Sequence, residues 1–259
     1  MIFDTHAHYD DARFDEDRDE VIASLKENDV RHFVDVASDL PSIEKVERII
    51  EKYPQSYGAL GIHPSELEGV SEKDLKEIEE KIRNNKRIVA VGEIGLDYYW
   101  EENPPHEVQK EFFRYQLEMA RRLNKPVIIH SREAAQDTFE IMKEMRAEEI
   151  GGVVHCYSYS KEMAREYIKM GFYIGIGGVV TFKNSKKLKE IAAEIPLERI
   201  VIETDCPYLA PSPHRGERNY SGFLPLVAAE IAELRGITAE EVCNTTYQNA
   251  LRLYNIKDV

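Results

Sequence analysis

The chain has 259 residues, enough to bury a large hydrophobic core, and no Pro-, Gly- or Ser-rich linker divides it. We therefore expect a single domain over residues 1–259. The 48 acidic and 34 basic residues give a formal net charge of −14, which argues against broad, non-specific binding to nucleic-acid backbones. A phosphate substrate held by metal ions stays compatible with this charge, because divalent cations would invert the local field.

The cysteines and the chain ends bear on the cellular compartment. Cys156, Cys206 and Cys243 are widely spaced and form no CxxC motif, which is typical of a protein in a reducing cytosol. Neither end has a basic segment followed by a long apolar run, and ligand-type histidines at positions 6 and 8 leave no room for a cleavable leader. The sequence thus favours a cytoplasmic protein without a membrane span.

Eight short apolar runs recur along the chain, and most are continuous stretches of Val and Ile. Such stretches indicate strands that a parallel sheet buries on both faces. The predicted strands cover residues 2–5, 33–37, 57–62, 88–92, 126–130, 152–156, 172–177 and 199–204.

Amphipathic segments alternate with these runs and predict helices. The segment 71–83 also begins with a capping signal, because its first residue is Ser71 and Asp74 occupies the capping-box position. The predicted helices cover residues 17–26, 43–53, 71–83, 106–123, 134–145, 161–170, 186–195, 222–234 and 239–254.

Strand–helix alternation repeated eight times predicts the α/β class and a closed (β/α)8 barrel, for which about 250 residues is a typical length. An open, doubly wound sheet is the alternative. It is disfavoured because no G-x-G-x-x-G follows the first strand and because eight units suit closure.

Histidines stand at the C-terminal ends of several predicted strands, where a parallel barrel would gather them at one mouth. His6 and His8 alternate with Thr5 and Ala7, so their side chains project to the same side of the first strand. His130 and His155 each end another strand. Any one of them alone has an equally ordinary explanation as a hydrogen-bonded core residue, but together they predict a divalent metal site.

Carboxylates complete this set. Glu93 follows four buried apolar residues, where an ionised group is costly unless it meets cations, and a buried salt bridge is the alternative to a metal. Asp205 ends the last strand and could bind metal while accepting a proton from water. Glu203 lies on the same face one layer deeper, where a supporting role and an ion pair inside the barrel are equally compatible with the sequence.

Two arginines are candidates for holding an anionic group. Arg132 lies two residues beyond His130, and Arg215 lies in a locally basic loop, residues 211–219, that follows the last strand. Arginine suits phosphate because its planar guanidinium donates two parallel hydrogen bonds. A solvated loop is the alternative for Arg215. The aromatic run 98–100 could shape a substrate wall or pack on a helix.

With these residues assembled, the chain closely resembles the TatD-type metal-dependent deoxyribonuclease family, a group of amidohydrolase-like TIM barrels. The resemblance runs from end to end, and seven motifs in the same order are far more specific than any one of them. The motifs are FDTHAH (3–8), GIHP (61–64), VGEIGLD (91–97), PVIIHSR (126–132), HC (155–156), ETDCPYL (203–209) and PHRG (213–216).

The resemblance implies a TIM barrel with two divalent cations. Carried onto this sequence, one cation would be held by His6, His8, Glu93 and Asp205, and the other by Glu93, His130 and His155. Glu93 is the evident bridge, since residues 88–97 contain no Lys that carbamylation could turn into a bridging ligand. Asp205 and Glu93 would be the catalytic residues, and His63, Arg132 and Arg215 would position the phosphate.

Such a site suits hydrolysis of DNA phosphodiester bonds by a metal-activated water. The family implies 3′–5′ exonuclease action, so the expected partners are DNA ends or short oligonucleotides, with no membrane and no stable protein partner indicated. The alternative is an amidohydrolase or esterase that uses the same two metals on a small carbonyl substrate. A non-enzymatic binding protein is disfavoured by the complete ligand set. The metals could be Zn, Mn, Co, Ni or Fe, and Mg is less expected from these ligand types.

Overall fold

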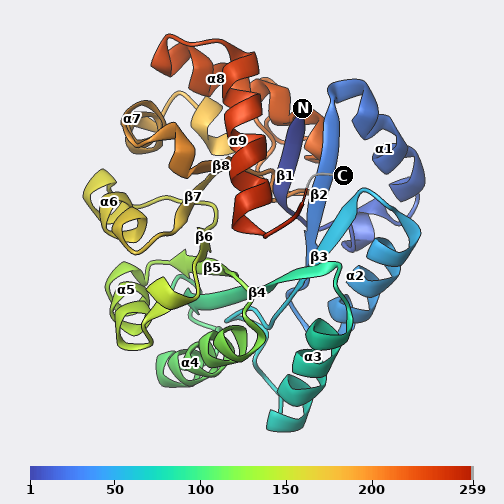
Figure 1. Ribbon diagram of the computed structural model, residues 1–259, viewed down its shortest axis with the longest axis vertical. Helices are drawn as coiled ribbons and strands as arrows, with labels where there is room; N and C mark the ends of the chain where they lie inside the picture. The colour runs from blue at the N-terminus through green and yellow to red at the C-terminus, as the bar shows by residue number, and fades with distance from the viewer. Residues whose placement is uncertain (258–259) are drawn as a thin grey trace.

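The computed structural model describes residues 1–257 and contains one eight-stranded sheet whose neighbours follow the chain order (Figure 1). All successive strand pairs are parallel. A single parallel bridge between Ala7 and Cys206 brings the first and last strands together, so the barrel is nearly closed. The strands are β1 Ile2–Ala7, β2 Val30–Val36, β3 Ser56–Leu60, β4 Ile88–Asp97, β5 Val127–Arg132, β6 Gly152–Val154, β7 Tyr173–Ile176 and β8 Ile200–Ile202.

Helices follow the strands around the outside of the barrel (Figure 1). The predicted (β/α)8 TIM barrel is therefore confirmed. Within residues 1–257, no helix is both long and apolar enough to span a membrane. The α-helices are α1 Arg18–Ser24, α2 Leu40–Lys52, α3 Glu72–Asn84, α4 His106–Leu123, α5 Ala135–Glu144, α6 Lys161–Lys169, α7 Lys186–Glu194, α8 Leu224–Arg235 and α9 Ala239–Leu253.

Local sequence accounts for the start of α3 and for the end of α1. At α3 the backbone N–H of Asp74 donates to Ser71 Oγ, and the Asp74 carboxylate accepts the backbone N–H of Ser71, so the predicted capping box is present. The first predicted helix is shorter than expected, because α1 ends at Ser24 and a 3-10 turn, Leu25–Asn28, continues it to Asp29 in a left-handed conformation.

Every strand differs in length from its predicted range, and three of these differences bear on the mouth of the barrel. β4 runs five residues past the expected end at 92, since Ile94 and Leu96 pair with β5 and stay buried. Gly92 and Gly95, of a residue type that often marks a turn, lie inside this strand. β6 and β8 are shorter than expected, because Cys156 and Asp205, just beyond them, adopt left-handed backbone angles with φ of 43° and 56°.

The interior of the barrel is filled by inward-facing apolar side chains from most of the strands, and α9 covers one end of it. Residues of α9 belong to the same apolar cluster as these strand residues. Just after the helix, the hydroxyl of Tyr254 donates a hydrogen bond to the backbone carbonyl of Thr5. The cluster includes Phe3, Val34, Val36, Ala59, Ala90, Ile128, Val153, Val201, Tyr247 and Leu251. A solid core therefore supports the opposite end, the mouth.

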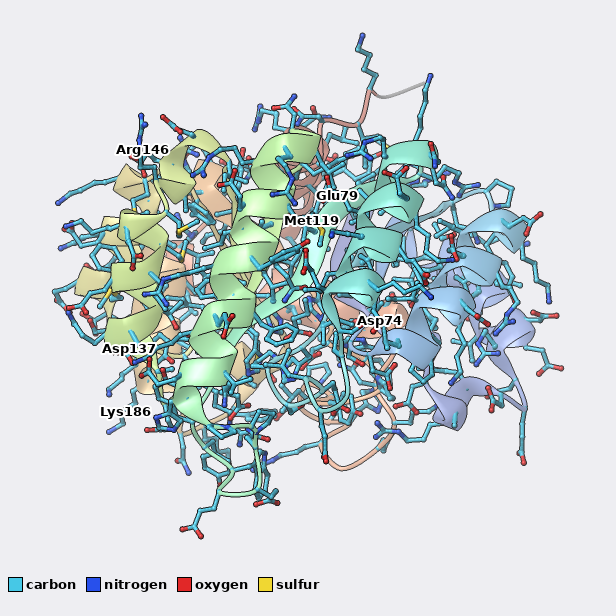
Figure 2. All side chains as sticks on the ribbon, turned by 90° about the horizontal axis from the view of Figure 1, so that it is seen from below. Asp74, Glu79, Met119, Asp137, Arg146 and Lys186 are labelled. Carbon is cyan, nitrogen blue, oxygen red and sulfur yellow. The ribbon has the colours of Figure 1, made fainter. Side chains whose placement is uncertain are left out.

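Figure 2 shows the two ends of the barrel from the side. Asp137 and Lys186, near the beginnings of α5 and α7, lie in the lower part of the view, and Arg146, beyond the end of α5, lies toward the upper edge. In α3, Asp74 near its beginning lies below Glu79. Because each of these helices begins after a strand has ended, the C-terminal strand ends and the loops that follow them face downward in this view.

Candidate metal centre

Six side chains that the sequence singled out as metal ligands come together at the mouth of the barrel. His6 and Glu93 project from β1 and β4 and His130 from β5. His8 and His155 follow directly after β1 and β6, and Asp205 lies three residues beyond the end of β8. A cavity of about 590 Å³ opens above them. The five that line this cavity are His8, Glu93, His130, His155 and Asp205, and His6 lies fully buried beneath.

Glu93 is at the centre of the group. Its Oε1 lies 2.6 Å from His155 Nε2 and 2.8 Å from His130 Nδ1. Its Oε2 lies 3.3 Å from His6 Nε2 and 3.9 Å from the matching atom of His8. Each carboxylate oxygen therefore faces a different pair of imidazoles. This is the arrangement that a carboxylate shared by two cations requires.

Asp205 joins one of the two pairs. Its Oδ1 lies 3.4 Å from His8 Nε2 and 3.8 Å from His6 Nε2. The left-handed backbone at Asp205 is held in place by its own N–H, which donates to His6 O across the β1–β8 seam. The side chain of Asp205 is 19% exposed, so its carboxylate reaches the cavity while the ring of His6 does not.

Hydrogen bonds fix which nitrogen two of the imidazoles present to the site. His8 Nδ1 donates to Val36 O at 2.7 Å, which leaves Nε2 facing Asp205 and His6. His130 Nε2 lies 3.0 Å from Asp97 Oδ2, which leaves Nδ1 facing Glu93. A metal-binding histidine is usually oriented in this way: the ring nitrogen that does not face the metal donates its N–H to a carboxylate or a backbone carbonyl.

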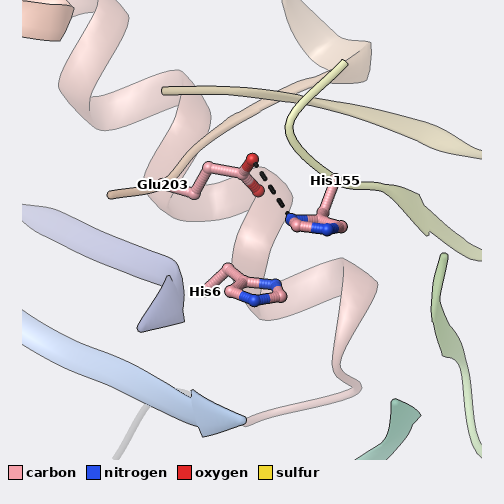
Figure 3. A group of neighbouring side chains, drawn as sticks. All are labelled: His6, His155 and Glu203. Carbon is pink, nitrogen blue, oxygen red and sulfur yellow. Dashed lines mark ion pairs between the residues drawn. The ribbon is translucent and has the colours of Figure 1, made fainter. Parts of the chain in front are cut away.

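Buried polar atoms without partners surround the same point. His6 Nδ1, His155 Nδ1 and Glu203 Oε2 have no hydrogen-bond partner. Figure 3 shows the rings of His6 and His155 stacked, with centroids 4.1 Å apart, and Glu203 above His155 at 3.8 Å. Imidazole nitrogens and carboxylate oxygens packed this closely fit a divalent transition metal, since a cation would give their lone pairs a common partner.

Without a metal, protons on the histidines balance the carboxylates. Burial opposes a charge on His8, but the hydrogen bond and the charge of Asp205 raise the pKa of His8 to about 10. Burial likewise opposes a charge on His155, and Glu93 raises the pKa of His155 to about 9. Burial and the neighbouring His155 lower the pKa of His6 to about 4. Burial would raise the pKa of Glu93, but His155 and His6 hold it well below its usual value.

Glu203 lies one layer deeper, as the sequence predicted. It is fully buried, and its Oε1 accepts the backbone N–H of Cys156. Burial raises the pKa of Glu203 to about 8. The carboxyl is therefore protonated at neutral pH in the metal-free protein, which gives it a supporting place behind His155 and no strong ion pair.

The three predicted phosphate-positioning residues are placed differently from one another. His63 lines the cavity with Nε2 at 3.7 Å from Glu93 Oε1, and Arg132 lines the same cavity with its guanidinium 3.8 Å from the centre of the Tyr99 ring. Arg215 is outside the cavity lining and stacks on Phe182 at 4.6 Å. The structure therefore brings His63 and Arg132 to the ligand group and leaves Arg215 outside the cavity.

Asp97 is the member of this site whose role the sequence reasoning missed. The sequence motif contains Asp97 without assigning it a role, whereas in the structure its carboxylate contacts His130 Nε2. The signal was present, because residues 93, 95 and 97 alternate on one face once β4 is extended to its full length. Ending the strand at residue 92 concealed this alternation.

The chain is similar to known proteins over nearly its whole length. The family model described as TatD related DNase matches residues 3–255. The metal-dependent hydrolase YabD of Bacillus subtilis is 46% identical over 256 residues, covering 99% of this chain and 100% of that protein. The metal-dependent hydrolase YcfH of Escherichia coli K12 is 36% identical over 262 residues, covering 99% and 96%.

Solved structures give the same result. The crystal structure of YjjV, a TatD homologue from Escherichia coli K12, superimposes with a TM-score of 0.93 at 30% identity, covering 99% of this chain and 98% of that one. The sequence motifs, the barrel and its mouth thus lead to one conclusion. The chain belongs to the TatD family of metal-dependent hydrolases.

Proposed function

We propose that this hydrolase is a deoxyribonuclease that removes nucleotides from single-stranded 3′ ends. The observation that carries the proposal is the position of Glu93 between two imidazole pairs at the floor of a cavity whose wall carries Arg132. A shared carboxylate matches a two-cation site, and a guanidinium on the wall matches the anionic phosphate beside it.

The ligand groups divide into two sets that share Glu93. One set is His6, His8, Glu93 and Asp205, and the other is Glu93, His130 and His155. Two divalent cations held there would supply a more acidic water and neutralise charge on the phosphoryl oxygens. The 3.0 Å contact between His6 Nε2 and His8 Nε2 supports this division, since both nitrogens point to one position.

Asp205 is the residue placed to accept a proton. It is the more exposed of the two ligand carboxylates that line the cavity, and burial, which would raise its pKa, is outweighed by His8 and His6, which lower it. The carboxylate therefore stays ionised at neutral pH and can take a proton from a water in the cavity. Glu93, in contrast, is 4% exposed and has both oxygens occupied by imidazoles.

His63 is placed to donate a hydrogen bond to the substrate. Its Nδ1 accepts the backbone N–H of Ser65 at 3.1 Å, and burial together with His130 lowers the pKa of His63 to about 3. The ring is therefore neutral, and its remaining proton is on Nε2, which faces Glu93 and the cavity. A neutral donor and the Arg132 cation together suit two oxygens of one phosphate.

The preference for single-stranded ends follows from shape and charge. The ligand group lies below loops that surround the barrel mouth, so a strand end can enter more easily than the middle of a rigid duplex. The net charge of −14 weakens the attraction for long duplex DNA. The 3′ polarity is the family expectation.

The test is cleavage by the metal-loaded protein of single-stranded oligonucleotides labelled at either end, beside closed circular duplex DNA and a panel of amides and esters. We expect release of mononucleotides from the 3′ end and little nicking of the circle. Rapid internal nicking would overturn the exonuclease assignment. Turnover of an amide or ester, with no cleavage of any phosphodiester, would favour the amidohydrolase alternative. Protein stripped of metal by a chelator serves as the control.

A further inference from the structure

The mouth of the barrel carries an unusual concentration of exposed apolar side chains. Among the described residues, the large apolar side chains that are clearly exposed are Met1 and four others: Tyr99, Trp100, Tyr208 and Leu209. These four are between 40% and 49% exposed and occur as two adjacent pairs. Exposed apolar residues are normally scattered singly over a protein surface. A cluster of them beside a cavity is typical of a ligand-binding or interaction surface.

The two pairs stand on opposite sides of the ligand group. Tyr99 and Trp100 follow β4, and Tyr208 and Leu209 follow β8. In a barrel with neighbour order β1 to β8, the β4–β5 side lies diametrically across from the β8–β1 side. Trp100, Tyr208 and Leu209 line the same cavity as Glu93, so the pairs face each other across the site.

An arginine packs on a ring of each pair. The guanidinium of Arg132 lies 3.8 Å from the centre of the Tyr99 ring and 5.6 Å from that of Trp100. The guanidinium of Arg13 lies 4.1 Å from the centre of the Tyr208 ring. Such cation–π contacts orient the rings while leaving their outer faces open.

The two arginines differ in charge balance. Arg13 is paired with the Asp11 carboxylate at 2.9 Å, so its charge is largely compensated. Arg132 makes no ion pair with a carboxylate anywhere in residues 1–257 and is the one Arg or Lys among the described residues that line the cavity. An aromatic surface with an unpaired cation at its edge matches a nucleotide, whose base presents a flat π-face and whose phosphate is anionic.

We propose that these side chains form two stacking platforms, Tyr99–Trp100 on one side and Tyr208 on the other, which hold the unpaired bases on either side of the cleaved bond. The inference rests on the proposed nuclease function and names the part of the substrate that the site would recognise. Stacking tolerates every base, because each has a π-face. Bases in a duplex already stack on one another, so the platforms select single strands of at least two nucleotides.

The position of Trp100 allows a direct binding test, since it is the single tryptophan of the chain. The metal-loaded protein is titrated with a phosphorothioate tetramer of thymidylate, which resists hydrolysis, while Trp100 fluorescence is recorded. The matched probe has the same backbone with a tetrahydrofuran in place of every base. We expect saturable quenching by the thymidylate tetramer and at least about tenfold weaker binding of the base-free probe. Equal binding of both probes would overturn the inference.

Variants then test each platform separately. Tyr208→Leu should weaken binding of the thymidylate tetramer about tenfold with quenching still visible, because Trp100 is unchanged. Trp100→Leu and Tyr208→Leu should each raise KM for single-stranded DNA about tenfold and change kcat by less than about twofold. Tyr115→Leu is the matched control, since this tyrosine packs with Arg122 on the outer helix α4.

A base-free phosphodiester, methyl 4-nitrophenyl phosphate, separates this inference from the proposed function. Tyr115→Leu should leave its hydrolysis unchanged, and Tyr208→Leu should lower kcat/KM for it much less than kcat/KM for single-stranded DNA, because the ester has no base to stack on the ring. If the protein cleaves single-stranded DNA but neither platform variant changes KM, the stacking inference is refuted while the proposed nuclease function is supported. If thymidylate binds on the platforms but no phosphodiester is cleaved, the proposed nuclease function is refuted while the stacking inference is supported.

Discussion

Glu93 shows how a single buried carboxylate sets the character of the site. The side chain is 5% exposed and touches the rings of His6, His130 and His155, so its charge depends entirely on positive partners. When a positive partner of a buried, ionised carboxylate is removed, the uncompensated charge destabilises the folded protein. In the metal-free protein the protonated ring of His155 is such a partner, and two cations would take over this role.

Glu93→Gln should therefore keep the shape of the site and lose its function. The amide cannot supply the negative charge that two cations share, so we expect metal content to fall and hydrolytic activity to be lost. Elemental analysis of the purified variant beside an activity assay measures both. Glu203→Gln, a change of the same size one layer deeper, is the control and should retain metal. Full metal content with normal turnover in Glu93→Gln would contradict the two-cation site.

Asp205→Asn tests the proton acceptor. The variant should fold and keep at least one metal ion, because His6, His8 and Glu93 remain together. Turnover should fall by about two to four orders of magnitude, the usual consequence of removing a positioned proton acceptor. Glu203→Gln should lower turnover less than Asp205→Asn does, since Glu203 does not line the cavity. A nearly normal Asp205→Asn with an inactive Glu203→Gln would reverse the two roles.

Metal binding should release protons, because neutral imidazoles are needed to hold a cation. His8 and His155 have pKa values raised to about 10 and about 9, so both carry a proton at pH 7 in the metal-free protein. A raised pKa favours the protonated, metal-free form below that pKa, so apparent metal affinity should increase as pH rises from 7 toward 9. Calorimetry at pH 7 in two buffers of different ionisation enthalpy should report release of about two protons. A binding heat independent of the buffer would contradict this.

At the scale of elements, the period and composition of the apolar runs were enough to predict eight strands and the barrel. The ends of those strands were harder to predict from the sequence. They matter most for function, because the candidate metal centre lies at the C-terminal strand ends. Backbone conformation at Cys156 and Asp205 ends β6 and β8 early, and no local composition announces a left-handed residue of these types. The extension of β4 was hidden by its glycines, and with it the contact between Asp97 and His130.

The six proposed ligands were found because each ends an apolar run, while Arg215 was inferred from loop composition and lies outside the cavity lining. Loop composition gives residue types but not the direction in which the loop folds. The exposed pairs at 99–100 and 208–209 could be recognised only in the structure, since their alignment across the mouth depends on the barrel closing between β8 and β1.

Gly175 in β7 tests how tightly the strands pack below the metal centre. A Cβ at this position would lie 2.8 Å from Glu203 Cδ and closer still to Oε2, and Glu203 is fully buried with no room to retreat. Gly175→Ala should destabilise the protein by about 1–3 kcal/mol, as overpacking does. Denaturant unfolding measures this. Glu203→Ala in the Gly175→Ala background should recover part of the loss, and additive effects of the two changes would show that this contact is not the cause.

At the scale of the whole molecule, an acidic protein is proposed to act on an acidic polymer. The chain as a whole repels DNA, so attraction must be local, and within the described cavity lining it comes from Arg132 alone among Arg and Lys. The pairing of Arg218 with Asp17 and of Arg13 with Asp11 further reduces free positive charge near the mouth. Recognition by stacking and by the metal centre therefore has to replace the broad basic surface of many nucleases.

The salt dependence of binding should reveal this difference. Each phosphate of a single strand neutralised by Arg or Lys contributes about −0.7 to the slope of log affinity against log salt concentration. With Arg132 as the one Arg or Lys of the described cavity lining, a phosphorothioate thymidylate tetramer should give a slope of about −0.7, and Arg132→Gln should bring the slope close to zero. Trp100 fluorescence titrations at several potassium chloride concentrations measure both values. A slope steeper than about −4, unchanged in Arg132→Gln, would mean that DNA follows a basic track elsewhere on the molecule and enters the cavity by another route.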